Sequence, residues 1–110
     1  MKLRKLSTTY SVTEQIDEND LAILAESGYT DVVCHRPDDE EPGQPSFTEL
    51  AAAGARHRLR FHHIPIENGV DEVDVVRMAD ILSGASGQVL GYCRTGYRSE
   101  LLWNHANDAA

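Results

Sequence analysis

Residues 93–99, CRTGYRS, hold the groups with the clearest chemical potential in this 110-residue sequence. A thiol is followed by two arginines and a hydroxyl, between an apolar run typical of a strand and the run Leu101–Trp103, typical of a helix. Unpaired amides at a helix N-terminus and nearby guanidinium groups favour thiolate over thiol. Gly96 permits the positive φ of a tight loop. The pattern predicts a cysteine nucleophile at the bottom of an anion-binding loop.

Each residue of this loop, called the Cys93 loop below, has an expected role. Cys93 is the expected nucleophile, and Arg98 is the expected cation that grips the substrate. The other expected substrate-binding residues of the loop are Arg94, Thr95, Gly96, Tyr97 and Ser99. Tyr97 is expected to be exposed at the rim of the loop.

Strands that alternate with helices must position this loop. We expect strands over residues 9–12, 30–35, 59–66 and 88–93. We expect helices to begin at Asp17, Ser46, Asp71 and Ser99, the first three with an acidic residue three positions after the cap. The third helix is expected to bury Val73, Val76, Ile81 and Leu82. Gly28 and the sequence GASG are expected to end the first and third helices.

This order of elements predicts a single α/β domain over residues 1–110. Right-handed crossovers give a four- to five-stranded, mainly parallel sheet flanked by helices. Ligands of such sheets gather at the carboxyl ends of the strands. The segments expected at that edge are residues 34–36, 67–69 and 93–98.

Composition and net charge argue against several classes of function. The formal net charge of −8 argues against a general nucleic-acid binder, and no apolar run is long enough to cross a membrane. The start MKLRKLSTTYSV lacks the apolar region of a secretory signal, so we expect a cytoplasmic protein. The histidines lack the spacing of metal ligands, and we expect no metal and no cofactor. The acidic run RPDDEEPG, residues 36–43, is expected to be a solvated loop.

The Cys93 loop resembles the active-site loops of two enzyme groups. Protein tyrosine and dual-specificity phosphatases carry Cys, five residues, Arg, and then Ser or Thr. Rhodanese-type sulfurtransferases typically carry Cys and four residues before Arg or another residue. Four residues separate Cys93 from Arg98, so this loop has the rhodanese length.

The longer pattern GYTDVVCHRPDDEEPGQPS…HHIPI…VLGYCRTGYRS, ending in LLW, closely resembles the phosphatase-like domain of the beta-lactamase-hydrolase-like family over residues 6–103. The resemblance implies a dual-specificity-phosphatase-like fold. Members are described as phosphatases or as sulfurtransferases, and some are fused to a metallo-hydrolase-fold domain of the persulfide dioxygenase type. The resemblance also implies an ordering or substrate-binding role for Arg36, whose alternative role is a salt bridge within its loop.

Two chemistries fit these residues. A phosphatase of this fold also needs a general acid, usually an aspartate just after the IPI-like strand end. This chain has Glu67 there and Asp71 further on, as candidate acids. Sulfur transfer needs no separate acid, and a short loop fits a bare sulfur atom more easily than a phosphoryl group. We therefore favour a sulfurtransferase with a persulfide on Cys93. The alternatives are a phosphatase that forms a Cys93 phosphocysteine and a non-catalytic anion or redox sensor.

The sulfurtransferase interpretation brings its own partners. It predicts a small anionic or sulfane-sulfur substrate, a thiol acceptor such as glutathione, and a separate persulfide dioxygenase; it involves no nucleic acid and no membrane.

Cys34 stands where relatives commonly have Asn. If its strand neighbours that of Cys93, the Cα atoms could lie within disulfide range, roughly 4.4–6.8 Å. Cys34 is then a candidate resolving thiol, and its alternative is a buried strand residue.

Overall fold

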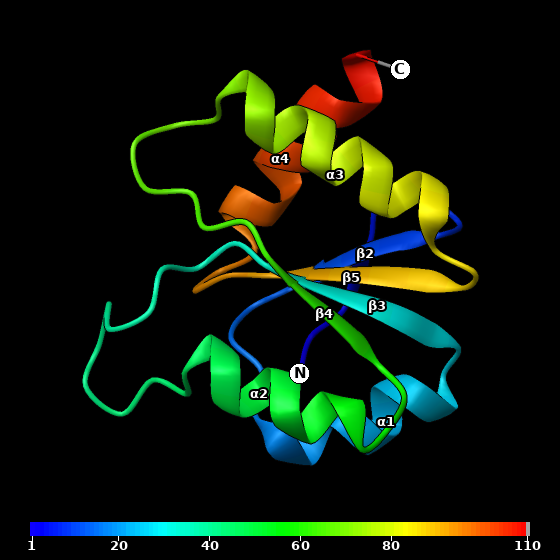
Figure 1. Ribbon diagram of the computed structural model, residues 1–110, viewed down its shortest axis with the longest axis vertical. Coiled ribbons are helices and arrows are strands. Elements are labelled where there is room, and N and C mark those ends of the chain that lie inside the picture. Colours follow the sequence, from blue (N-terminus) through cyan, green and yellow to red (C-terminus); the bar gives the residue numbers. More distant parts are fainter. Residues whose placement is uncertain (110) are drawn as a thin grey trace.

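A five-stranded sheet in the order β1-β2-β5-β3-β4 crosses the centre of the molecule (Figure 1). The structure is a computed structural model that describes residues 1–109. The strands are β1 (Arg4–Lys5), β2 (Tyr10–Thr13), β3 (Tyr29–Cys34), β4 (Arg60–His63) and β5 (Gln88–Tyr92). All neighbouring pairs are parallel except β1 and β2, which are antiparallel. The predicted α/β class and mainly parallel sheet are confirmed.

Helices cover both faces of the sheet (Figure 1). The helices are η1 (Glu18–Asp20), α1 (Leu21–Glu26), α2 (Phe47–Ala55), α3 (Glu72–Gly84) and α4 (Tyr97–Ala109). Helices α1 and α2 lie on one face over a core that includes Leu24, Val32 and Leu50. Helices α3 and α4 lie on the other over a core that includes Met78 and Leu102. No described helix is both long and apolar enough to span a membrane.

The predicted helix starts agree with the observed caps. Asp17 and Asp71 each cap a helix through complete capping boxes, with Asp20 and Asp74 as the reciprocal partners. The helix after Asp17 begins as a 3-10 turn before it continues as α1. At α2, the Ser46 hydroxyl accepts from the Glu49 amide at 3.1 Å, which caps the helix.

Three sequence expectations need correction. Strand β1 was not expected, because two exposed residues carry no periodic pattern. Helix α4 begins at Tyr97 rather than Ser99, so its first turn includes the end of the Cys93 loop. Val73 and Val76 are 66% and 59% exposed rather than buried, because α3 packs through the face that carries Met78 and its neighbours Val75, Ile81 and Leu82.

Strand β5 occupies the middle of the sheet between β2 and β3, which places Cys93 at the centre of the carboxyl edge. Only glycine fits at position 91 of this strand, because a Cβ there would lie 2.1 Å from the Tyr10 hydroxyl oxygen and clash with it. That hydroxyl donates to the Ser99 carbonyl at 3.2 Å. The first turn of α4 is thereby tied to the sheet just behind Cys93.

Candidate active site

The Cys93 loop joins the end of β5 to the start of α4, as the sequence predicts. Cys93 is fully buried, and the Gly96 amide donates to its sulfur at 3.0 Å. Gly96 has a φ of 95°, a conformation that side chains with a Cβ adopt only with strain. The glycine therefore lets the chain turn back over the sulfur and present its amides to it.

The surroundings of Cys93 favour its thiolate. Burial by itself raises the pKa of a thiol, but hydrogen bonds from the loop reverse that effect here. The amides of Thr95, Arg98 and Ser99 and the Ser99 hydroxyl hold the pKa of Cys93 below its usual value. The Ser99 hydroxyl is buried and pairs with no oxygen or nitrogen atom of the described chain. The lowered pKa agrees with the predicted role of Cys93 as a nucleophile.

Arg98 is held by Glu40, which lies in a distant part of the sequence. Its Nη1 donates to Glu40 Oε2 at 2.8 Å, and its Nη2 donates to Glu40 Oε1 at 2.9 Å. Nη1 also donates to the carbonyl of Ile66 at 3.2 Å. Hydrogen bonds from Arg98, with a lesser contribution from Arg36, hold the pKa of Glu40 down at about 2, so Glu40 is a carboxylate.

Arg36, the first residue of the acidic loop (residues 36–43), and Arg94 both pair with glutamates of that loop. Glu41 pairs with Arg94 Nε at 3.0 Å and with Arg36 Nη2 at 2.6 Å. The other nitrogens of Arg36 donate to Glu40 at 2.9 Å and to Gln15 at 2.9 Å. Arg36 therefore makes the salt bridges considered as the alternative to substrate binding, and every nitrogen of its guanidinium has a protein partner.

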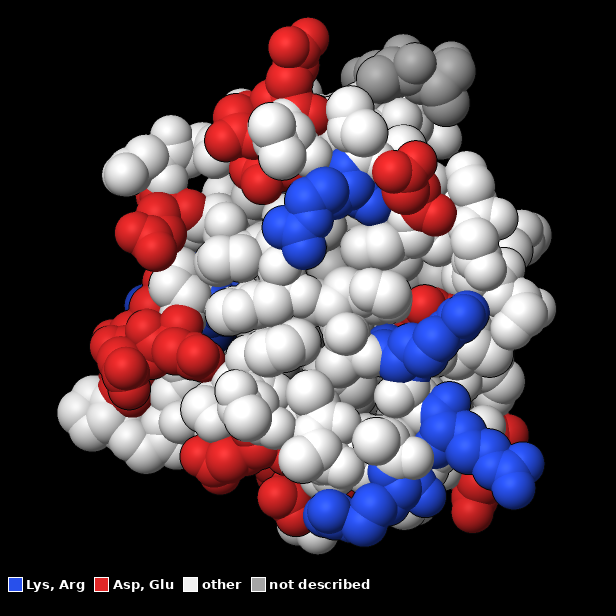
Figure 2. Space-filling view, viewed as in Figure 1, with Lys and Arg blue, Asp and Glu red and all other residues white. Residues whose placement is uncertain are grey.

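The acidic loop had been expected to be a solvated surface loop. Figure 2 shows acidic side chains gathered on the side of the molecule where this loop lies, with basic groups only just visible behind them. Glu40 and Glu41 were missed as site residues because ion pairs between distant segments leave no periodic or spacing pattern in a sequence. The density of acidic residues after an Arg-Pro pair was the only available indication.

The two candidate acids differ in their surroundings. Glu67 is exposed and follows Ile66, the residue whose carbonyl holds Arg98. The Asp71 carboxylate accepts from the Asp74 amide at 3.0 Å and caps α3. A hollow of about 350 Å³ adjoins this segment and is lined by residues 65, 67–71 and 74. Of the two acids, Glu67 is the one whose carboxylate is not committed to a helix cap.

Cys34 and His35 lie on β3 and just beyond it, beside β5. Cys34 pairs in register with Tyr92, and its thiol donates to the Arg36 carbonyl at 3.3 Å. Burial raises the pKa of Cys34, and both cysteines are free thiols. The crosslink to Cys93 stays a prediction. His35 donates from Nδ1 to the Ile64 carbonyl at 3.0 Å, and burial lowers its pKa to about 4. Its buried Nε2 has no hydrogen-bond partner among residues 1–109.

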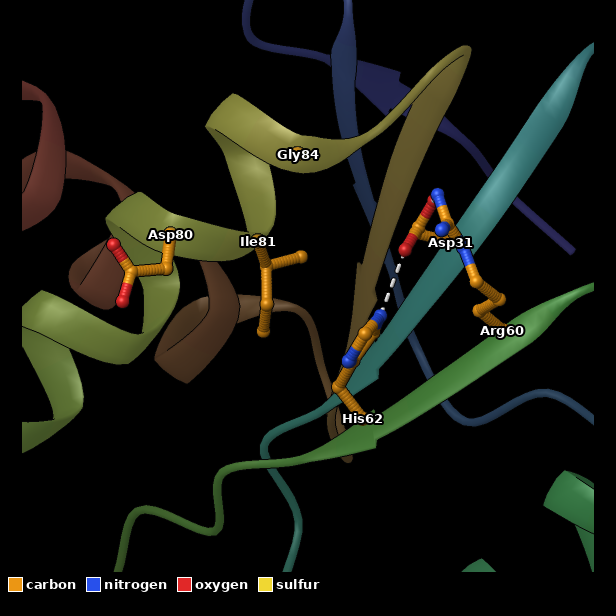
Figure 3. A pocket seen from close by; sticks show the side chains of 6 residues that line it. All are labelled: Asp31, Arg60, His62, Asp80, Ile81 and Gly84. Atoms are coloured by element: carbon orange, nitrogen blue, oxygen red, sulfur yellow. Dashed lines mark hydrogen bonds and ion pairs between the residues drawn. The ribbon is translucent and has the colours of Figure 1, made fainter.

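A second hollow, of about 220 Å³, lies at the opposite ends of β3 and β4, beneath α3 (Figure 3). Its polar centre is Asp31, which is 3% exposed and accepts from His62 Nε2 at 2.7 Å and Arg60 Nη2 at 3.0 Å. These bonds satisfy the buried carboxylate. Among the described residues no group of three or more metal-ligating side chains is present here or elsewhere.

Together these features define a class of protein. A buried cysteine with a lowered pKa sits between a central parallel strand and a helix, accepts a hydrogen bond from the Gly96 amide, and has an arginine at the loop's end. This is the arrangement of a phosphatase-like cysteine enzyme fold. Residues 2–110 match the phosphatase-like domain of the beta-lactamase hydrolase-like protein, and the chain belongs to that family.

Known proteins agree with this assignment. The chain is 28% identical over 104 residues to the beta-lactamase hydrolase-like protein of Xylella fastidiosa (strain Temecula1), a match that covers 94% of this chain and 24% of that protein. It is 33% identical to the crystal structure of a candidate phosphatase from Neisseria meningitidis Z2491, with a TM-score of 0.81 over 90% of this chain and 71% of that one. The chain thus spans about a quarter of the length of its curated relatives.

A more distant solved structure shares the fold. Tk-PTP, 17% identical, has a TM-score of 0.64 and covers 96% of this chain and 80% of its own. The dual-specificity-phosphatase-like fold implied by the sequence resemblance is confirmed. The named structures are phosphatase-like, so the comparisons favour the phosphatase alternative over the sulfurtransferase that the loop length had favoured.

Proposed function

We propose that the protein hydrolyses phosphoric monoesters through a phosphocysteine on Cys93. The observation that carries this proposal is the buried sulfur, which receives a hydrogen bond from the Gly96 amide and whose pKa is lowered by neighbouring amides. Amides that stabilise a thiolate also stabilise the oxygens of a phosphoryl group bound in the same loop. The match to a phosphatase-like domain supports the same chemistry.

The reaction divides into two displacements. The Cys93 sulfur attacks phosphorus, a P–S bond forms, and the P–O ester bond breaks; the leaving oxygen takes a proton from an acid or from water. Water then attacks phosphorus, the P–S bond breaks, and inorganic phosphate leaves with the thiolate restored. Loop amides and Arg98 stabilise the charge on the phosphoryl oxygens in both steps.

Glu67 is the candidate acid for the leaving oxygen. Both Glu67 and Asp71 line the hollow described above, but Glu67 is exposed, whereas the Asp71 carboxylate caps α3. Aryl phosphates need the least help from an acid, because their leaving oxygen is a stable anion. We therefore take an aryl phosphate as the first substrate to test. The hydrolysis of alkyl phosphates should depend more strongly on Glu67 than the hydrolysis of aryl phosphates does.

Sulfur transfer is a second candidate function, favoured by one specific observation. Four residues separate Cys93 from Arg98, where phosphatases of this fold carry five. In that reaction the Cys93 thiolate attacks the outer sulfur of a donor such as thiosulfate, an S–S bond forms on Cys93, and sulfite leaves. A nucleophilic acceptor such as cyanide or a thiol then removes the outer sulfur.

The decisive experiment compares both reactions on the same variants. Hydrolysis of p-nitrophenyl phosphate is measured for wild type, Cys93→Ser and the matched control Cys34→Ser. We expect turnover to fall about a thousandfold or more in Cys93→Ser and to persist in Cys34→Ser. Rapid quenching and mass spectrometry should show a phosphate adduct on Cys93.

Two results would contradict phosphatase function. One is turnover no faster than that of Cys93→Ser with every aryl phosphate tried. The other is a persulfide on Cys93, with thiosulfate as donor and cyanide as acceptor, in a protein without phosphatase activity. An inert protein that still binds phosphate would identify the non-catalytic sensor.

A further inference from the structure

One short segment controls both arginines of the Cys93 loop. Glu40 makes two parallel hydrogen bonds to Arg98, and Glu41 pairs with Arg94. Parallel bonds between a carboxylate and a guanidinium fix orientation as well as distance. The positions of the two loop cations therefore depend on residues more than 50 positions earlier in the sequence.

Arg36 is the anchor of that segment. Its side chain is 3% exposed, whereas those of Glu40 and Glu41 are 30% and 49% exposed. It binds both glutamates at once and is itself held by Gln15, which belongs to the connection after β2. The Arg36 carbonyl also accepts hydrogen bonds from Cys34 and His63, so its backbone is fixed to β3 and β4.

The partners of Arg98 leave one part of its guanidinium free. Glu40 and Ile66 accept from Nη1 and Nη2, and neither accepts from Nε. The Arg98 cation also interacts with the Cys93 sulfur. Glu40 holds the two terminal nitrogens of Arg98, which leaves Nε for an oxyanion bound at that sulfur while Glu40 stays in place.

We propose that Arg36 and Glu40 are positioning residues of the Cys93 loop, which together hold Arg98 so that its Nε edge meets the bound oxyanion. Arg36 acts through the two glutamates and does not touch the substrate. The inference rests on the proposed function in one respect: it takes the bound anion to be a phosphoryl group. The same geometry would orient Arg98 toward any tetrahedral oxyanion in the loop.

The opposite role makes an opposite prediction. If Glu40 occupied the place of the substrate, its carboxylate would compete with the anion, and removal of its charge would strengthen anion binding. If Glu40 positions Arg98, removal of its charge weakens anion binding, because the guanidinium is free to rotate away. The sign of the change in affinity distinguishes the two roles.

The experiment measures binding of inorganic phosphate to the full chain by calorimetry, and the hydrolysis of p-nitrophenyl phosphate. The variants are Glu40→Gln, Arg36→Lys and the double variant; Arg60→Lys, which alters an ion pair at the far end of the sheet, is the matched control. We expect the dissociation constant to rise about tenfold in each single variant. The double variant should be no weaker than the worse single one, because both act through one network.

Melting temperature separates positioning from folding. Glu40 lies at the surface, so Glu40→Gln should melt close to wild type while its phosphate affinity falls. A loss of turnover that follows a higher KM rather than a lower melting temperature supports positioning. Arg60→Lys should leave phosphate affinity unchanged.

Several outcomes overturn the inference. These are tighter phosphate binding in Glu40→Gln, affinities within twofold of wild type in both single variants, or no phosphate binding by wild type. If turnover requires Cys93 but both variants bind phosphate normally, this inference fails and the proposed function stands. If the variants lose phosphate affinity in a protein without turnover, the proposed function fails and the positioning roles stand.

Discussion

Cys93 owes its low pKa to the backbone that follows it. Burial opposes ionisation, and the amides and hydroxyl between Thr95 and Ser99 outweigh it. A backbone donor cannot be removed by substitution of one side chain, whereas the Ser99 hydroxyl can. The site therefore depends first on the loop's conformation, which Gly96 permits, and second on Ser99.

The rate at which Cys93 is alkylated should reveal its lowered pKa. The rate of Cys93 alkylation by iodoacetamide should reach half its maximum below about pH 8.5, the ordinary value for a free thiol. Loss of a donor destabilises the thiolate, so Ser99→Ala should move that midpoint to higher pH. Cys34 is buried like Cys93, but its pKa is raised, so it should react far more slowly in the folded protein. Mass spectrometry across a pH series gives both midpoints, and an unmoved midpoint in Ser99→Ala would contradict the role of the hydroxyl.

At the scale of helices and strands, the sequence predicts the features whose signals lie in neighbouring residues. The Asp71–Asp74 capping box and the strand before Cys93 lie within a few residues of their own patterns, and both were predicted from the sequence. The exposure of Val76 was not, because only the docking of α3 on the sheet decides which apolar residues it buries. The salt bridges of Arg36 and Arg98 with Glu40 required the folded positions of two distant loops.

The polar cluster of β3 and β4 makes a prediction about acid stability. Burial would raise the pKa of Asp31, but hydrogen bonds from His62, Thr30 and Arg60 lower it below 3.8. A depressed carboxyl pKa contributes stability above the unfolded-state value, and that contribution is lost as pH falls through the folded-state value. Urea unfolding should show stability that falls below about pH 4 in wild type.

Asp31→Asn is the matched variant for this cluster. It keeps the shape of the side chain but removes the charge that His62 and Arg60 face (Figure 3). We expect a loss of about 2 kcal/mol at pH 7 and a weaker dependence of stability on pH below 4. Equal stability of the variant and wild type at pH 7 would show that the charge contributes nothing.

At the scale of the whole molecule, charge opposes the proposed substrate. The formal net charge is −8, and the arginines of the site are paired with Glu40 and Glu41. Like charges repel over roughly 10 Å at moderate ionic strength. The net charge of the protein therefore repels the anionic substrate of the proposed reaction.

Salt should relieve this repulsion. We expect kcat/KM for p-nitrophenyl phosphate to increase as sodium chloride is raised from low to physiological concentration, because screening weakens long-range repulsion first. Initial rates over a salt series at constant pH test this. A rate that falls steadily with salt would mean that the local field of the Cys93 loop outweighs the overall charge.

The stacking of Trp103 on Tyr10 has an optical consequence. The two rings lie 5.8 Å apart and nearly parallel, and the Tyr10 hydroxyl holds the Ser99 carbonyl behind Cys93. Trp103 is the chain's single tryptophan. Its emission should change as inorganic phosphate is titrated in, and change much less in Tyr10→Phe, which keeps the stack but loses the hydroxyl; equal changes would contradict this coupling. Trp103 is thus linked to the Cys93 loop through Tyr10, and we expect its emission to report occupancy of the loop in the unlabelled protein.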